Sequence, residues 1–304
     1  MIETITRANA WLNGIVWGPP MLILLMGTGL LLTILTGAVQ FRHMGTALKE
    51  VLGKITQKGT GEGSVSPFGA VATALASTVG VGNIAGVATA LVLGGPGALF
   101  WLWVSGLLGM CTKFAEIVVA LHYRERDAGG TMRGGAMYSL RKQGLPWLGA
   151  IFAGITAIAA FGIGNMVQAN SVAQSLHTSF GVPTWAAGVG LVILSGAVIL
   201  GGIKRIAAFA QVLVPFMAII YIAGGLAIIL LHISELPAAI SLVFNSAFNG
   251  AAATGGFAGA TIMMAMRYGV ARGLFSNEAG LGSAPLVHAA ANTDHPVRQG
   301  MYGI

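Results

Sequence analysis

Long runs of apolar residues, separated by short polar stretches, cover almost the whole chain. A helix needs ~20 mostly apolar residues to cross the hydrocarbon of a bilayer, and seven runs reach or approach that length. They cover residues 15–41, 66–93, 97–122, 148–177, 184–202, 206–231 and 238–266. This pattern predicts an all-α, polytopic membrane protein.

The composition agrees with that prediction. The 304 residues are 55% hydrophobic and only 8% charged, with a mean hydropathy of +0.81, whereas soluble domains average ~25% charged residues. The first apolar run is too long for the core of a signal peptide, and Pro19-Pro20 mark a helix start, so we expect a retained helix. Cys111 is the single cysteine, which excludes an intrachain disulfide.

The basic residues favour one membrane orientation. Of the 16 Lys and Arg residues, all but Arg7 and Lys113 lie in four regions, which are residues 42–64, 123–147, 203–205 and the tail from 267. These regions are all cytoplasmic if the N-terminus is outside, as the positive-inside rule requires. We expect a multi-pass protein of a cytoplasmic (inner) membrane, in a bacterium. The net charge of +7 does not indicate nucleic-acid binding, because no basic block alternates with aromatic residues.

The second run contains an unusual centre, Ser77-Thr78-Val79-Gly80-Val81-Gly82-Asn83. Each glycine costs a helix interior ~1 kcal/mol relative to alanine, and Thr78 and Asn83 add side-chain oxygens. We expect an interrupted helix whose new ends offer N–H groups and carbonyls to a ligand. The alternative is that Gly80, Gly82 and Gly86 only permit close helix packing.

The seventh run has a comparable stretch at 250–259, five spans later. Two helices five spans apart cross the membrane in opposite directions. A pair of glycine-interrupted helices related in this way is typical of an inverted-repeat transporter with its binding site near the midplane.

Such a site could hold a zwitterionic amino acid. The N–H groups of Gly82 and Asn83 could face the carboxylate, and the carbonyls of 76–79 could face the ammonium or a cation. In the fourth span, Asn165 and Gln168 lie three residues apart, hence on one helix face. Gln168 could reach the carboxylate and Phe161 could cover the apolar side chain; alternatively, the amides only join two helices. In the seventh span, Thr254, Gly255 and Gly256 would contribute to the binding site in the corresponding way.

The neutral surroundings favour sodium as the coupling ion. Residues 66–104 and 148–202 contain no Asp, Glu, Lys or Arg. A proton-coupled carrier needs a titratable group at its site, whereas sodium needs only neutral oxygens. Lys113 and Glu116, three apart in the third span, could pair for structural reasons, although charges in a membrane are often functional. We expect no enzyme and no cofactor, since Asp127 and Asp294 lie in loops and no metalloprotease motif occurs.

Four segments, 66–86, 94–97, 161–171 and 272–285, resemble in this order the alanine/glycine:cation symporter family, the sodium:alanine symporters. The resemblance implies a LeuT-like five-plus-five fold. In it, 15–41 is an additional helix, 66–231 the first repeat, 238–266 the first helix of the second repeat, and 267–304 a cytoplasmic segment. Val79-Gly80-Val81-Gly82-Asn83 is similar to the break in sodium-coupled members of that fold. That likeness implies one sodium at the Thr78 carbonyl, the Asn83 side chain and Thr254, and a second at the carbonyls of Ala76 and Val79.

Family members are longer, with about four further spans, so the second repeat would be incomplete. We therefore expect a fragment or a chain that needs a complementing partner. We also expect Ser276 to cap a helix with Glu278 in its first turn, lying along the inner face of the membrane. The function predicted is sodium-driven uptake of alanine or glycine by alternating access, with serine not separable. The alternatives are a transport-incompetent fragment, a membrane scaffold subunit, a proton-coupled carrier and a passive channel.

Overall fold

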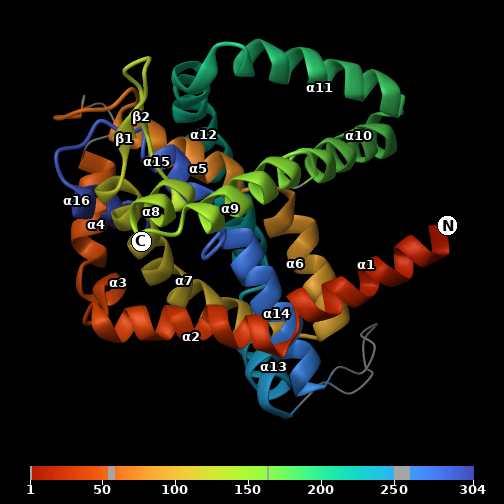
Figure 1. Cartoon of the computed structure of the whole chain (residues 1–304). Helices are drawn as coiled ribbons and strands as arrows, with labels where there is room; N and C mark the ends of the chain where they lie inside the picture. Colours follow the sequence, from red (N-terminus) through yellow and green to blue (C-terminus); the bar gives the residue numbers. More distant parts are fainter. Residues whose placement is uncertain (1, 54–58, 163, 250–260) are drawn as a thin grey trace. The chain divides into compact units, whose positions relative to one another are not determined.

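The apolar runs form helices throughout the computed structural model, which describes residues 2–53, 59–162, 164–249 and 261–304 (Figure 1). These residues form two compact units. The first unit comprises Met1–Met44, Gly82–Lys113 and Ala223–Leu281. The second comprises Gly45–Val81, Phe114–Ile222 and Gly282–Ile304.

The first unit begins with two consecutive helices. Pro19 and Pro20 open α2, which confirms the predicted helix start, but the single helix predicted over 15–41 is wrong. Gly37 and Ala38 have φ of 63° and 58°, in the left-handed region, and this conformation ends α2. The helices are α1 (Ile2–Val16), α2 (Pro19–Leu35), α3 (Val39–Arg42), α6 (Val81–Gly94), α13 (Leu236–Asn249) and α14 (Ile262–Asn277), with parts of α7 (Gly97–His122) and α12 (Gly202–Leu231).

Glycines let α14 pack directly on α7 within the first unit. A Cβ on Gly269 would collide with the Ala98 carbonyl, and one on Gly273 would collide with the Ser105 hydroxyl. Contact this close between two helix backbones is the usual role of small residues in membranes. It makes α14 a helix of the bundle rather than a segment lying on the membrane surface.

The helix α14 therefore corrects the prediction for the region after Arg267. Its N-cap is Thr261, whose hydroxyl accepts a hydrogen bond from the Met264 N–H at 3.2 Å. Ser276 lies in its last turn and is not an N-cap, and Glu278 follows with a left-handed φ of 51°. Tyr268 contacts Gly94 at the end of α6. The residue after Arg267 therefore lies against the last residue of α6.

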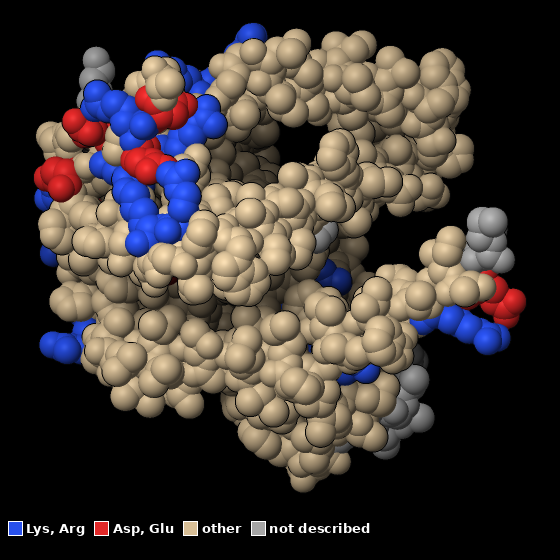
Figure 2. Space-filling view, viewed as in Figure 1, with Lys and Arg blue, Asp and Glu red and all other residues tan. Residues whose placement is uncertain are grey.

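The second unit contains the charged hairpin and the remaining helices. The hairpin consists of β1 (Glu125–Arg126) and β2 (Met132–Arg133), which pair antiparallel with Glu125 opposite Arg133. Figure 2 shows basic and acidic side chains gathered over this hairpin. Residues 143–203 contain no Lys, Arg, Asp or Glu. The elements are α4 (Met44–Gly53), α5 (Pro67–Thr78), β1 (Glu125–Arg126), β2 (Met132–Arg133), α8 (Ala136–Lys142), α9 (Pro146–Ala159), α10 (Met166–Phe180), α11 (Thr184–Ile199), α15 (Ala284–His288) and α16 (Pro296–Met301), with parts of α7 and α12.

Arg124 holds the C-terminal segment in place within the second unit. Its guanidinium donates to the carbonyls of Ala289 at 3.3 Å, Ala291 at 2.8 Å and Thr293 at 3.2 Å. Half-burial lowers the pKa of Arg124, with Glu62 opposing that shift. The three carbonyls accept hydrogen bonds from three of the five N–H groups of this half-buried guanidinium.

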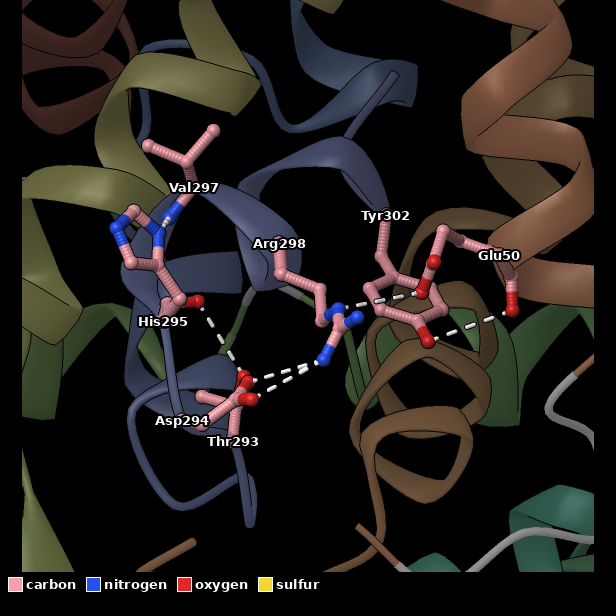
Figure 3. Close-up of polar contacts among 7 residues, drawn as sticks. All are labelled: Glu50, Thr293, Asp294, His295, Val297, Arg298 and Tyr302. Carbon is pink, nitrogen blue, oxygen red and sulfur yellow. Dashed lines mark hydrogen bonds and ion pairs between the residues drawn. The ribbon is translucent and has the colours of Figure 1, made fainter. Parts of the chain in front are cut away.

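A second cluster fixes α16 (Figure 3). Arg298 lies between two carboxylates, Asp294 at 3.1 Å and Glu50 at 3.6 Å. The Tyr302 hydroxyl donates to the Glu50 carbonyl at 3.4 Å. Burial, assisted by the charge of Glu50, raises the pKa of Tyr302 to about 12, against a smaller opposing effect of Arg298.

Four helical segments of the described chain are long and apolar enough to cross a membrane. They are Glu3–Leu35, Pro67–Gly94, Gly97–His122 and Gly202–Leu231. The shorter apolar helices Pro146–Ala159, Thr184–Ile199 and Leu236–Asn249 have at most 16 residues, or about 24 Å at 1.5 Å per residue, against a hydrocarbon thickness of ~30 Å. The helix predicted over 148–177 is divided into α9 and α10.

Candidate functional site

The predicted interruption of the second span is confirmed. α5 ends at Thr78 and α6 begins at Val81. Val79 has an extended conformation, with φ −89° and ψ 99°, and its N–H donates the last bond of α5 to the Leu75 carbonyl at 2.7 Å. The next residue in helical conformation is Val81, so α5 and α6 are separate helices, with the carbonyl end of one beside the N–H end of the other in the chain.

The hydroxyl groups at the end of α5 are bonded to their own helix. Thr78 donates to the Ala74 carbonyl at 2.7 Å, and Ser77 donates to the same carbonyl at 2.8 Å. Each hydroxyl oxygen keeps lone pairs that can accept another hydrogen bond or coordinate a cation. Thr78, Val79 and Gly80 are half-buried, so this end of α5 is open in part to its surroundings.

In the second unit, two residues of the predicted site lie together. A Cβ built on Gly80 would lie 3.6 Å from the amide nitrogen of Gln168. The amide oxygen of Gln168 is buried and has no hydrogen-bond partner among the described residues. An unpaired buried acceptor is costly, and it is a feature expected where a ligand donates the missing bond.

In the first unit, glycines of α6 differ in what surrounds them. A Cβ on Gly86 would collide with the guanidinium of Arg272, so Gly86 serves packing, as the alternative interpretation proposed. A Cβ on Gly82 would have the Ser276 hydroxyl at 3.5 Å and an Arg272 nitrogen at 3.9 Å as its nearest described neighbours. These are ordinary contacts, so packing against the described residues does not require glycine at position 82. Asn83 is half-buried beside it.

The fourth span does not present Phe161 and Asn165 as predicted. α9 ends at Ala159 and α10 begins at Met166, so Phe161 does not share a helix face with Gln168. Asn165 is the N-cap of α10: its side chain accepts from the Met166 N–H at 2.6 Å and donates to the Ala160 carbonyl at 2.8 Å. The Phe161 side chain is 79% exposed. The continuous helix is wrong because Asn165 caps a new one.

Lys113 and Glu116 each form a hydrogen bond with a backbone group near the end of α14. The Lys113 ammonium donates to the Asn277 carbonyl at 3.0 Å within the first unit. The Glu116 carboxylate accepts from the Gly282 N–H at 3.2 Å within the second. A cation at a helix C-terminus stabilises that helix, so both contacts support the structural interpretation of these charges.

Several predicted site residues cannot be compared with the structure. Thr254, Gly255 and Gly256, and the second predicted interruption at 250–259, lie outside the described residues. Ala76 and Val79, in contrast, are described: Ala76 lies in the last turn of α5, and Val79 is the C-cap of that helix. Within the described ranges, no group of three His, Cys, Asp or Glu side chains could hold a metal ion.

Sequence reasoning missed two features of this region. The first is the break before α10, although Gly162-Ile163-Gly164-Asn165 repeats the Gly-x-Gly-Asn pattern of Gly80-Val81-Gly82-Asn83. The second is the position of Arg272, which was assigned to a tail and instead lies against Gly86. The spacing of four between Gly269 and Gly273 was a usable indication that this segment packs as a helix.

Together, the apolar helices and an interrupted helix that offers backbone donors and acceptors define a multi-pass membrane protein of the transporter class. Comparison with known families identifies it further. The chain belongs to the sodium:alanine symporter family, whose profile matches residues 2–304. The members of this family are transporters that carry out symport, not enzymes.

Named relatives are similar over almost the whole chain. The sodium/alanine symporter AgcS of Methanococcus maripaludis is 52% identical over 295 residues, which are 95% of this chain and 64% of the relative. A transporter of Haemophilus influenzae is 50% identical over 303 residues, 99% of this chain and 65% of the relative. The "Probable sodium/glutamine symporter GlnT" of Bacillus subtilis is 37% identical over 292 residues, 95% of this chain and 59% of the relative. The chain thus spans less than two thirds of the length of these relatives.

Proposed function

We propose that this chain acts in sodium-coupled symport of a small neutral amino acid, alanine or glycine, into the cell by alternating access. The observation that carries the proposal is the interruption between Thr78 and Val81 in an apolar helix. An unwound turn at membrane depth is tolerated where it lines a cavity or is covered by protein. The N–H groups at the start of one helix and the carbonyls at the end of the other suit the two ends of a zwitterion.

The proposed binding site has one contribution from each helix end. The N–H groups of Gly82 and Asn83 would receive the carboxylate at the start of α6, where the helix dipole favours a negative charge. Gln168, with its unpaired amide oxygen next to Gly80, would accept from the ammonium or, through its nitrogen, donate to the carboxylate. Because neither Gly80 nor Gly82 has a side chain, the substrate could approach the backbone closely at both residues.

Sodium is the coupling ion that suits these groups best. α5 and α6 contain no ionisable side chain, so a proton has no evident carrier there. The Thr78 carbonyl, the Asn83 side chain and Thr254 would coordinate one sodium ion, and the carbonyls of Ala76 and Val79 would contribute to a second, as hard cations prefer oxygen ligands. The proposed architecture is the LeuT-like inverted repeat, in an inner membrane with the N-terminus outside.

The test is uptake of radiolabelled alanine into proteoliposomes under a sodium gradient, a proton gradient or neither. Two forms are compared: this chain, and the chain continued past Ile304 with the remaining residues of the Methanococcus maripaludis relative. We expect sodium-dependent uptake that unlabelled glycine inhibits more strongly than glutamine. Uptake by neither form, or at the same rate without sodium, would contradict the proposal, and stimulation by the proton gradient alone would indicate the proton-coupled alternative.

A matched pair of variants localises the ion. Asn83→Ala removes a proposed sodium ligand, whereas Asn245→Ala removes an exposed amide of α13 that donates to the Ser241 hydroxyl at 3.2 Å. We expect Asn83→Ala to raise the sodium concentration for half-maximal uptake at least tenfold without changing the melting temperature. Asn245→Ala should leave both unchanged. An equal loss of folding and uptake in Asn83→Ala would favour a packing role.

A further inference from the structure

A cavity of about 290 Å³ lies within the first unit. The end of α1 and the residue after it form one wall, the second half of α6 another, and α14 the third. The residues that matter for its chemistry are Asn13, Trp17, Thr89, Leu93, Arg267 and Arg272.

Two guanidinium groups face this cavity without an opposing charge. Arg267 and Arg272 are both half-buried and both line it. Every Asp and Glu of the sequence belongs to the described ranges, and within those ranges neither arginine makes an ion pair or a hydrogen bond. Partly buried charges normally have partners, so the cavity has the electrostatic character of an anion site.

The arginines are held by aromatic rings rather than by carboxylates. The guanidinium carbon of Arg267 lies 6.0 Å from the ring centre of Tyr268, and that of Arg272 lies 5.5 Å from that of Phe275. Trp17 meets Phe275 edge to face at 6.4 Å. Stacked guanidinium groups keep their N–H edges free for an anion, because the ring contacts use only their faces.

The surroundings favour a phosphate group. Paired arginines match the oxygens of phosphate with bidentate hydrogen bonds. Trp17, Tyr268 and Arg267 are residue types enriched at the level of lipid headgroups, and Tyr268 contacts Gly94 at the terminal residue of α6, where a spanning helix ends. Leu93 lines the cavity and is 41% exposed, which would let an acyl chain continue along the apolar outside of α6.

We propose that this cavity is a phosphate-binding site, which takes the headgroup of an anionic phospholipid or a free phosphate ion. Basic pockets between transmembrane helices recognise lipid headgroups in this way. The site is separate from the proposed transport function and does not depend on it.

Native mass spectrometry of the detergent-purified chain tests the proposal, with phosphatidylglycerol, phosphatidylcholine, inorganic phosphate and alanine as probes. We expect phosphatidylglycerol to bind with a dissociation constant at least tenfold lower than that of phosphatidylcholine. The double variant Arg267→Gln/Arg272→Gln should weaken that binding at least tenfold. Arg7→Gln is the matched control, since Arg7 is an exposed arginine of α1 paired with Glu3 at 3.4 Å, and should change it less than twofold.

A second variant keeps the proposal testable if the double variant does not fold. Ala271→Leu keeps both charges but fills part of the cavity, and should weaken phosphatidylglycerol binding at least threefold. Competition by inorganic phosphate would identify a free-phosphate site, and its absence a headgroup site. Any of three results would overturn the proposal. Arg7→Gln could weaken phosphatidylglycerol binding as much as the double variant does, or the Ala271→Leu and double variants could fold and still bind phosphatidylglycerol as tightly as the wild type. The third result is displacement of phosphatidylglycerol by alanine.

Discussion

Alanine substitutions at Gly82 and Gly86 separate ligand access from helix packing. The two glycines lie four residues apart in α6, so each substitution adds the same methyl group to the same face of one helix. At Gly86 the methyl group would meet the guanidinium of Arg272, with its Nε only 2.8 Å away, whereas at Gly82 the nearest described atom is the Ser276 hydroxyl at 3.5 Å.

The two substitutions should change stability in opposite directions. Alanine stabilises a helix by about 0.5–1 kcal/mol relative to glycine, and at residue 82 no described contact opposes that gain. We expect Gly82→Ala to raise the free energy of unfolding by up to ~1 kcal/mol. At residue 86 the methyl group must displace the Arg272 guanidinium, the flexible end of a side chain that lies 5.5 Å from the centre of the Phe275 ring. The cation–π contact that this shift breaks contributes about 0.5–2 kcal/mol, so Gly86→Ala should lower the free energy of unfolding by up to ~1 kcal/mol.

Transport should follow a different order from stability. Gly82→Ala places a methyl group where the carboxylate is proposed to meet the backbone, so sodium-dependent alanine uptake should fall at least tenfold. Gly86→Ala should lose uptake only in proportion to its folded fraction. The measurements are thermal unfolding in detergent and uptake in proteoliposomes, normalised to folded protein. Wild-type uptake by Gly82→Ala would refute backbone recognition at this residue, and equal stabilisation of both variants would refute the packing argument at Gly86.

Three further predictions concern other parts of the structure. Gln168→Leu removes the unpaired amide oxygen, so stability should change by less than ~1 kcal/mol while uptake falls at least tenfold; a parallel loss of both would mean that the amide is structural. Arg124→Gln removes hydrogen bonds to three carbonyls and should destabilise the protein by about 3 kcal/mol, with faster hydrogen exchange at 289–293; unchanged exchange would contradict this. The Tyr302 phenol, with its pKa raised to about 12, should stay neutral at pH 11 when folded. The stability that it contributes is present below its ordinary pKa of ~10 and is lost as pH rises through 12. A phenolate absorbance titration of wild type against Tyr302→Phe checks this, and ionisation near pH 10 would contradict it.

The sequence was sufficient to predict the interruption before Val81, because Gly80 and Gly82 within an apolar run oppose a continuous helix by local energetics alone. The turn between α6 and α7 was predictable for the same reason: Gly95 has a φ of 70°, which glycine adopts freely. The packing surface of α14 could not be predicted from the sequence, because the polar residues around Arg272 suggested a segment at the membrane surface. Its burial depends on Gly269 and Gly273 meeting α7, a contact between residues far apart in the chain.

The position of Phe161 shows a second limit. Residue spacing predicts a shared face only if the helix is continuous, and Asn165 instead starts a new helix by bonding to the Met166 N–H. Gln168 remains in place because it belongs to the helix that follows the cap. Spacing across the glycine pair before α10 was therefore not a guide to a shared helix face.

The uncharged stretch from 143 to 203 has an electrical consequence. A unit charge that crosses the full membrane potential does work of ~2.3 kcal/mol per 100 mV. Because this stretch contains no Lys, Arg, Asp or Glu, a displacement of α10 and α11 along the membrane normal would move no permanently charged side chain through the field. If the proposed symport holds, a current measured during such a movement would come from the coupled cations and not from charged side chains of these two helices.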